Sequence, residues 1–208
     1  MSSRQETTNT LLDELDRTGQ LTSQAHTYID EAIDHYSRNA FWFNEEIATA
    51  QTVTGEEYLD LPANWGLEYT INVQIGTNTY PLNERTFAQM DDLYISAANY
   101  TGYPEDYCIY REQIRLGPIP SGAYTLKMAY LKQPNDLTSD SATNISLENI
   151  NELVRMRAAR RMCERILQDT DRAQYFLRDE MEALRMARSK SSRYQMTGHS
   201  RKRGRRHG

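Results

Sequence analysis

The sequence predicts an α+β fold: a helical bundle built from N- and C-terminal helices, a small antiparallel β domain inserted between them, and an extended C-terminal tail. Apolar residues recur at spacings of three and four near both ends of the chain, which indicates amphipathic helices. Between them the spacing becomes two, and Gly, Pro and Asn interrupt the pattern, as in short strands. The expected segments are the first helices at 1–46, the β region at 47–143, the last helices at 144–188 and a basic extended tail at 189–208.

The N-terminal segment predicts two helices. Residues 7–18 form the first, and Gly19 is expected to end it, because glycine favours the left-handed conformation found just past a helix. The second is expected to begin near Thr22 or Ser23, and acidic residues fill its outer face. Its apolar stripe consists of Ala25, Ile29, Ala32, Ile33, Tyr36 and Ala40.

Three consecutive aromatic residues, Phe41, Trp42 and Phe43, follow the second helix. On a helix they would spread around a wide arc, whereas in an extended chain Phe41 and Phe43 point one way and Trp42 the other. We interpret them as a helix-to-strand hinge wedged between two layers. Core packing explains this run better than a platform on which a ligand stacks.

The middle of the chain predicts short strands and turns. Further strands are expected at 56–61 and 102–110, and a short helix at 84–96. The clearest alternation runs from 67 to 75, and the side chains expected to share one face are Leu67, Tyr69, Ile71, Val73 and Ile75.

A hairpin is the strongest local prediction. Ile114 and Leu116 end one strand, residues 117–122 (GPIPSG) reverse the chain, and every second residue from 124 to 130 is apolar in the next strand. A polar loop is expected at 133–143.

Two more helices are expected after this loop. Ser146 is the expected N-cap of the third helix, and the chain is expected to break and start a new helix at 169–171. The apolar stripes are Ile150, Leu153, Val154, Ala158, Met162 and Ile166 in the third helix, and Ala173, Phe176, Leu177, Met181 and Leu184 in the fourth. Five arginines surround the third helix's stripe and either pair with the acidic second helix or face an acidic partner: Arg155, Arg157, Arg160, Arg161 and Arg165.

The residue types that usually carry chemistry show no catalytic or metal-binding pattern. Cys108 and Cys163 have no CxxC or Cys/His neighbour, so both are expected to be reduced and partly buried. His26 and His35 fall on opposite sides of the second helix. The sequence contains no metal-ligand, P-loop or nucleophile-elbow motif. We therefore expect no enzyme activity, no metal and no cofactor, and no apolar stretch is long enough to span a membrane.

Charge is distributed unevenly along the chain. From Ala183 onward there are nine Lys or Arg and no acidic residue, whereas the preceding part holds 15 basic and 29 acidic residues. A nucleic-acid-binding domain usually carries its positive charge on the folded face, so the acidic body argues against that class. The basic end is expected to dock on an acidic protein surface, with nucleic-acid contact and disorder as alternatives. Its candidate docking residues are Arg193, Tyr194, Arg201, Lys202, Arg203, Arg205 and Arg206.

Several short segments occur in an order found in one protein family. They are Phe41-Trp42-Phe43-Asn44, Leu59-Asp60-Leu61-Pro62, Gly102-Tyr103-Pro104-Glu105-Asp106-Tyr107, Ile114-Arg115-Leu116-Gly117-Pro118-Ile119-Pro120, Tyr124-Thr125-Leu126 with Tyr130, Pro134-Asn135-Asp136-Leu137, and Leu153-Val154 with Ala158-Ala159. Over residues 20–190, the sequence resembles the head-to-tail adaptor proteins of tailed bacteriophages, the connectors that include tail tubular protein A-like proteins. The long basic end departs from this pattern.

The resemblance implies a structural virion protein of the neck, assembled in the cytoplasm of the bacterial host. Such adaptors form rings, usually of twelve copies, that contact the portal protein and the next tail or nozzle component. Genomic double-stranded DNA passes through the ring without its sequence being read, and no membrane is involved. The C-terminal segments of the family commonly dock on the portal. A nucleic-acid-binding protein that uses the basic arm, or a small hydrolase with an unrecognised site, are the alternatives.

Overall fold

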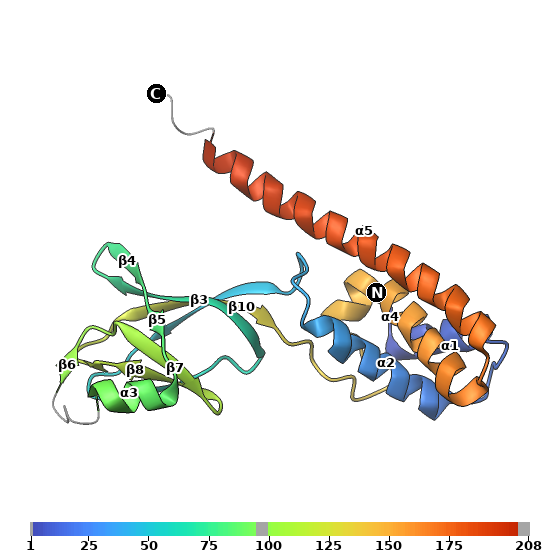
Figure 1. Cartoon of the computed structure of the whole chain (residues 1–208), viewed down its shortest axis with the longest axis horizontal. Coiled ribbons are helices and arrows are strands. Elements are labelled where there is room, and N and C mark those ends of the chain that lie inside the picture. The colour runs from blue at the N-terminus through green and yellow to red at the C-terminus, as the bar shows by residue number, and fades with distance from the viewer. Residues whose placement is uncertain (1, 95–99, 204–208) are drawn as a thin grey trace. The chain divides into compact units, whose positions relative to one another are not determined.

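The computed structural model describes the backbone of residues 2–94 and 100–203, and the side chains of this part as far as Tyr194. The chain forms two compact units (Figure 1). We name Met1–Glu45 with Gln133–Gly208 the helical unit, and Glu46–Lys132 the β unit. Residues 133–143, which the sequence grouped with the β region, belong to the helical unit. Their backbone bonds to its first helix, since Arg4 and Gln5 N–H groups donate to the carbonyls of Ala142 and Asp140, both at 2.9 Å.

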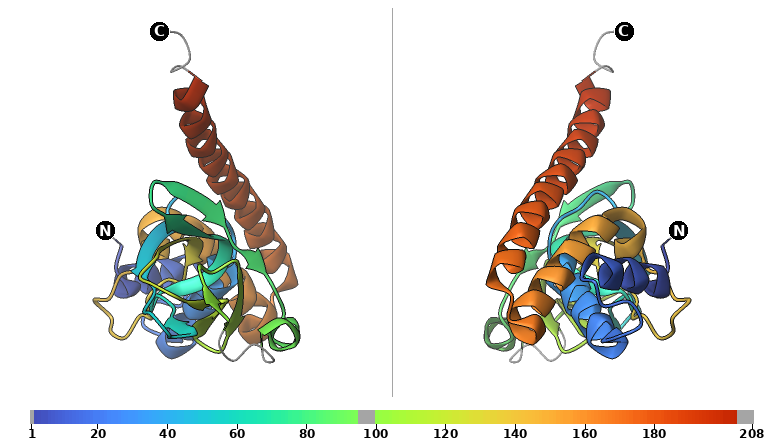
Figure 2. Two further views of the ribbon diagram at one scale, coloured as in Figure 1. Left: turned by 90° about the vertical axis from the view of Figure 1, so that its left-hand side faces the viewer. Right: turned by 90° about the vertical axis from the view of Figure 1, so that its right-hand side faces the viewer.

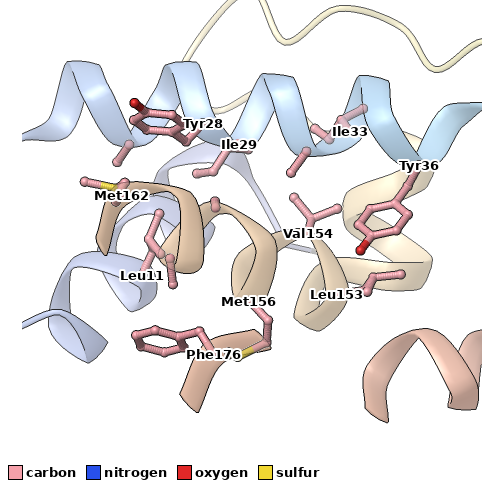
Figure 3. Close-up of a cluster of buried hydrophobic side chains, with 14 of the residues drawn as sticks. Leu11, Tyr28, Ile29, Ile33, Tyr36, Leu153, Val154, Met156, Met162 and Phe176 are labelled. Carbon is pink, nitrogen blue, oxygen red and sulfur yellow. The ribbon is translucent and has the colours of Figure 1, made fainter. Parts of the chain in front are cut away.

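The helical unit has one core, to which every helix contributes. Figure 3 shows the middle layer, α4, with Ile29 and Ile33 of α2 on one side and Phe176 of α5 on the other. Contacts join α2 to α4 and α4 to α5, so α4 forms the layer between the other two. The helices are α1 (Arg4–Glu14), α2 (Thr22–Ser37), α4 (Ile145–Met162) and α5 (Thr170–Arg203), with the π-helical turn η1 (Cys163–Leu167) before α5.

The starts of α1 and α4 follow local capping rules, with one correction to the predicted caps. Ser3 and Glu6 form a capping box that begins α1 earlier than the sequence suggested. The cap of α4 is Asn144 and not Ser146, since its side chain accepts a hydrogen bond of 3.0 Å from the Leu147 N–H. Ser146 is instead buried in the first turn. The predicted break before the last helix is confirmed: Gln168 adopts the left-handed conformation and α5 begins at Thr170.

The end of α1 also differs from expectation. The helix ends at Glu14, five residues before Gly19, because Asp16 already adopts the left-handed conformation that stops it.

The prediction of an extended tail from Ser189 was wrong, because α5 continues as one helix through Arg203 (Figure 2). The residues between 185 and 197 are mostly good helix formers, and no Gly or Pro interrupts them. The Ser191 hydroxyl donates back to the Ala187 carbonyl at 2.9 Å and so fits the helix interior. Arg205 and Arg206 lie outside the described residues, as do the side chains of Arg201, Lys202 and Arg203.

Within its described residues, 46–94 and 100–132, the β unit contains three small sheets and one helix. Their strand orders are β1-β10-β3-β4, β2-β8-β7-β5 and β6-β9. The helix expected at 84–96 is confirmed as α3 (Phe87–Tyr94), while residues 95 and 96 lie outside the described part. The strands are β1 (Glu45–Gln51), β2 (Tyr58–Asp60), β3 (Trp65–Ile75), β4 (Asn78–Pro81), β5 (Asn83–Glu84), β6 (Thr101–Gly102), β7 (Asp106–Tyr110), β8 (Gln113–Gly117), β9 (Ile119–Pro120) and β10 (Thr125–Lys132).

The predicted hairpin between residues 114 and 130 was wrong. Strand β8 pairs with β7 and β2, whereas β10 pairs with β3, so the two strands belong to different sheets. The intervening segment forms β9, which pairs with β6 in the third sheet. The hairpin in this region is β7–β8, closed by a turn in which Arg111 has a φ of 57°. A connection that contains proline can close a hairpin within one sheet, but it can also join strands of two different sheets.

A β-bulge changes the face that β3 presents. Along β10, Ala129 is opposite Thr70 and Tyr130 is opposite Glu68, so Tyr69 is an extra residue. The alternation expected over 67–75 therefore reverses at this point. Ile71 is buried, whereas Leu67 and Tyr69 are 54% and 48% exposed.

Gly117 lies where a side chain has no room. A Cβ atom there would lie 2.4 Å from Cε2 of Tyr94 and 2.9 Å from the terminal methyl of Met90. Both neighbours come from α3, so glycine at this position allows α3 to pack closely on β8.

We expect Gly117→Ala to lower the free energy of unfolding of the β unit by about 1–3 kcal/mol, the usual cost of overpacking a core. Urea unfolding followed by tyrosine fluorescence would measure it. Gly122→Ala is the matched control, because its nearest neighbour is 3.8 Å away, in Tyr124. Equal effects of the two substitutions would contradict the close packing of α3 on Gly117.

Candidate interaction site on helix α5

The aromatic run at 41–43 is tied to the helical core. Phe41 is buried, and its ring stacks on that of Phe43 with centroids 5.5 Å apart. Asn44 is also buried and holds the turn: its Oδ1 accepts from the Phe41 N–H at 2.9 Å, and its Nδ2 donates to the Asn39 carbonyl at 2.8 Å. These bonds pair a backbone N–H and a carbonyl of the turn that follows α2. The turn therefore holds Trp42 in a fixed position.

Trp42 contacts the C-terminal part of α5. Its ring is parallel to that of Tyr194 within 10°, with centroids 6.0 Å apart. The ammonium of Lys190 lies 4.1 Å from the centroid of the Trp42 ring, a cation–π distance. The backbone N–H of Trp42 donates to Ser191 Oγ at 3.3 Å. The predicted hinge residue thus also supports the predicted docking residue Tyr194, a pairing that sequence reasoning missed.

The spacing of residues along α5 could have indicated the contact between Trp42 and the C-terminal part of this helix. The inward stripe passes through Ala173, Phe176, Glu180, Ala183, Ala187, Ser191 and Tyr194, at intervals of three and four. The first six are buried. The stripe therefore extends past Ser189, where the apolar pattern was expected to end.

A buried carboxylate fixes the middle of α5 against α2 and α4. Glu180 is 5% exposed. Its oxygens accept from the Tyr36 hydroxyl at 2.6 Å, from Arg157 at 2.9 Å and from Arg160 Nε at 2.7 Å. Burial, followed by the bond to Glu180, raises the pKa of Tyr36 far above its ordinary value, so the phenol stays protonated and donates. The charge of Glu180 is compensated by two guanidinium groups.

One alternative was that the arginines of α4 pair with the acidic residues of α2. Their ion pairs are formed with other helices or within the same segment. Arg155 pairs with Glu14 of α1 at 3.1 Å, and Arg161 pairs with Glu164 one turn along at 3.1 Å. Arg157 lies over the ring of Tyr36 of α2, but its carboxylate partner is on α5. The acidic residues of α2 are not the partners in these pairs.

Among the exposed charged residues of α5 from Arg178 to Arg193, Glu182 is acidic and the others are basic. Arg178, Arg185 and Arg188 are exposed, and within the described part of the chain no carboxylate forms an ion pair with them. Of the predicted docking residues, Arg193 and Tyr194 have described side chains, and both are exposed.

A shallow hollow lies next to Trp42 and is lined by Ile150, Ala183, Ala187 and Lys190. The helical path of α4 is interrupted at Ile150.

The described residues offer no arrangement typical of catalysis. Cys108 and Cys163 are buried free thiols, and burial raises the pKa of Cys163 to about 11, which disfavours a thiolate. In residues 2–94 and 100–194 no group of three or more His, Cys, Asp or Glu side chains is placed to hold a metal ion. Within the described part, no helix is both long and apolar enough to cross a membrane.

We expect Glu180→Ala to lower the free energy of unfolding by about 3–5 kcal/mol, because two buried guanidinium groups lose their shared partner. Thermal or urea unfolding would measure the change. Glu182→Ala, an exposed position two residues along, serves as the control and should stay within about 0.5 kcal/mol of the parent. A loss no larger than that of the control would contradict the compensating role of Glu180.

Trp42→Ala should loosen the end of α5 selectively. The loss of the Tyr194 stacking and the Lys190 contact should lower the local opening free energy by about 1–2 kcal/mol, which corresponds to roughly tenfold faster amide exchange. Hydrogen–deuterium exchange would show this at residues 187–194, with 173–180 unchanged. Tyr175→Ala, on the opposite side of α5, is the matched control. Uniform acceleration along α5 would instead indicate general destabilisation.

The family model described as SU10 adaptor protein matches residues 4–203. No curated protein matches the sequence.

Proposed function

The chain belongs to the SU10 adaptor protein family, and from this membership we propose that it is the head-to-tail adaptor of a tailed bacteriophage. In this proposal twelve copies form a ring beneath the portal, join the capsid to the next tail or nozzle component, and continue the DNA channel in the virion neck. The observation that carries the proposal is the extent of the match, because residues 4–203 include nearly all of both units and the whole of α5.

The structure of α5 supports a docking role for the C-terminal end. A flexible tail loses conformational entropy when it binds, at a cost of about 1–2 kcal/mol per ordered residue for the backbone. A helix that is already formed as far as Arg203 avoids much of that cost. The contacts of Trp42 with Lys190, Ser191 and Tyr194 fix the direction of the helix where it leaves the core. We propose that Arg193, Tyr194 and the basic residues 201–206 bind an acidic surface of the portal.

The charge of the β unit fits a channel through which DNA passes without being held. Residues 46–132 contain 11 acidic and five basic residues. Arg85, Arg115 and Lys132 are paired with carboxylates of the same unit. A surface of net negative charge repels the phosphate backbone, which favours free passage of DNA over binding.

Native mass spectrometry of the protein mixed with the portal protein of the same phage tests the proposal. Twelve copies of the 24.2 kDa chain would add about 290 kDa to the portal ring. Deletion of residues 195–208 should abolish or strongly weaken this addition. This deletion is preferable to one from Ser189, because the longer deletion would also remove Lys190, Ser191 and Tyr194, which contact Trp42.

A full-length control separates charge from length. It replaces Arg201, Lys202, Arg203, Arg205 and Arg206 by Gln, and should bind as weakly as the deletion if charge drives docking. Absence of any complex, together with salt-dependent DNA binding that the deletion removes, would support the nucleic-acid-binding alternative instead.

A further inference from the structure

Helix α5 has a second side that is suited to burial. Its inward stripe packs on the core of the helical unit. At 100° per residue, Tyr175, Arg178, Glu182 and Arg185 fall on the opposite side, and Met181 lies at its edge. Tyr175 and Met181 are 62% and 63% exposed. A helix that exposes large apolar side chains away from its core side is typical of one that lies between two bodies.

The opposite side of the helical unit carries the complementary charge. Because α4 lies between α2 and α5, the outer faces of α2 and α5 point away from each other (Figure 3). Asp30 and Asp34 of α2 and Asp136 of the loop at 133–143 line a hollow floored by Ile33 and Leu137. We name this hollow the acidic groove.

Of the three carboxylates of the acidic groove, one forms an ion pair within the described part of the chain. Asp30 is bound by Arg4 at 2.6 Å. Within the described part, neither Asp34 nor Asp136 has a basic partner, just as Arg178 and Arg185 have no acidic one. The two surfaces thus have opposite charge, and each combines its unpaired charges with apolar side chains.

We propose that the outer face of α5 in one copy docks in the acidic groove of the next copy, with Arg178 and Arg185 opposite Asp34 and Asp136 and with Met181 on the apolar floor. The two surfaces lie on opposite sides of one unit, so the contact is heterologous and repeats from copy to copy. A contact of this kind closes into a ring when the rotation between copies allows it. The inference rests on the proposed ring-forming function and assigns the surfaces that meet in the ring.

Charge reversal tests the contact, because a heterologous interface can be restored by mixing. One variant carries Arg178→Glu and Arg185→Glu, and the other carries Asp34→Lys and Asp136→Lys. Each variant alone places like charges opposite each other, so we expect at least about a tenfold loss of ring assembly on the portal, measured by native mass spectrometry. In an equal mixture every contact between unlike copies joins opposite charges, so assembly should return in rings where the two variants alternate.

Controls separate this contact from folding and from the proposed function. All four positions are at or near the surface, so thermal unfolding of each variant should match that of the parent protein. A variant with Arg17→Glu and Arg165→Glu reverses two exposed charges elsewhere on the unit and should assemble normally. If the parent protein forms a ring but either reversal variant assembles equally well, or the mixture is not restored, this inference is overturned and the adaptor function stands. If the parent protein forms no ring with or without the portal, the proposed function itself fails.

Discussion

The carboxylate of Glu180 lies at the meeting point of α2, α4 and α5, where water is excluded. An ionised group in such a place is tolerated only when charges and hydrogen bonds replace its hydration. Arg157, Arg160 and Tyr36 supply these partners within 2.6–2.9 Å. Each partner comes from a different turn or helix, so the three helices have little freedom to slide past one another. The position of α5 on α4 follows from this constraint.

Once α5 is fixed at Glu180, the residues after it determine where the helix leads. Ala183 and Ala187 are small and buried, which lets the helix approach the core closely. One turn further, Ser191 and Tyr194 meet Trp42, which Asn44 holds at the end of α2. The aromatic turn at 41–43 is therefore the last contact of α5 with the core that the described side chains show. Beyond it α5 continues as a helix to Arg203, with a basic sequence, on a chain whose β unit is acidic.

The β unit depends on a different constraint, close packing around Arg115 and Gly117 of β8. Arg115 is buried, and its guanidinium is bound by Glu57 and Asp91 and lies 4.8 Å from the ring of Phe87. Gly117 leaves room for the Tyr94 ring, whose hydroxyl donates to Asp106 at 2.6 Å. Both sets of contacts attach α3 to β7 and β8. The short strands of this unit thus gain much of their order from side-chain contacts with one small helix.

The sequence by itself determined the helices, the α+β class and the resemblance to phage adaptors, because spacing, caps and turn residues act over a few neighbouring positions. The family match confirms that resemblance. Only the tertiary structure decided which strands pair: β8 joins β7 and not β10, and a bulge at Tyr69 turns Leu67 outward, since register depends on contacts between residues far apart in the chain. The same holds for α5. Its stripe from Ala173 to Tyr194 was present in the sequence, but Tyr36, Trp42 and Arg157 lie 23 or more positions from the α5 residues that they contact.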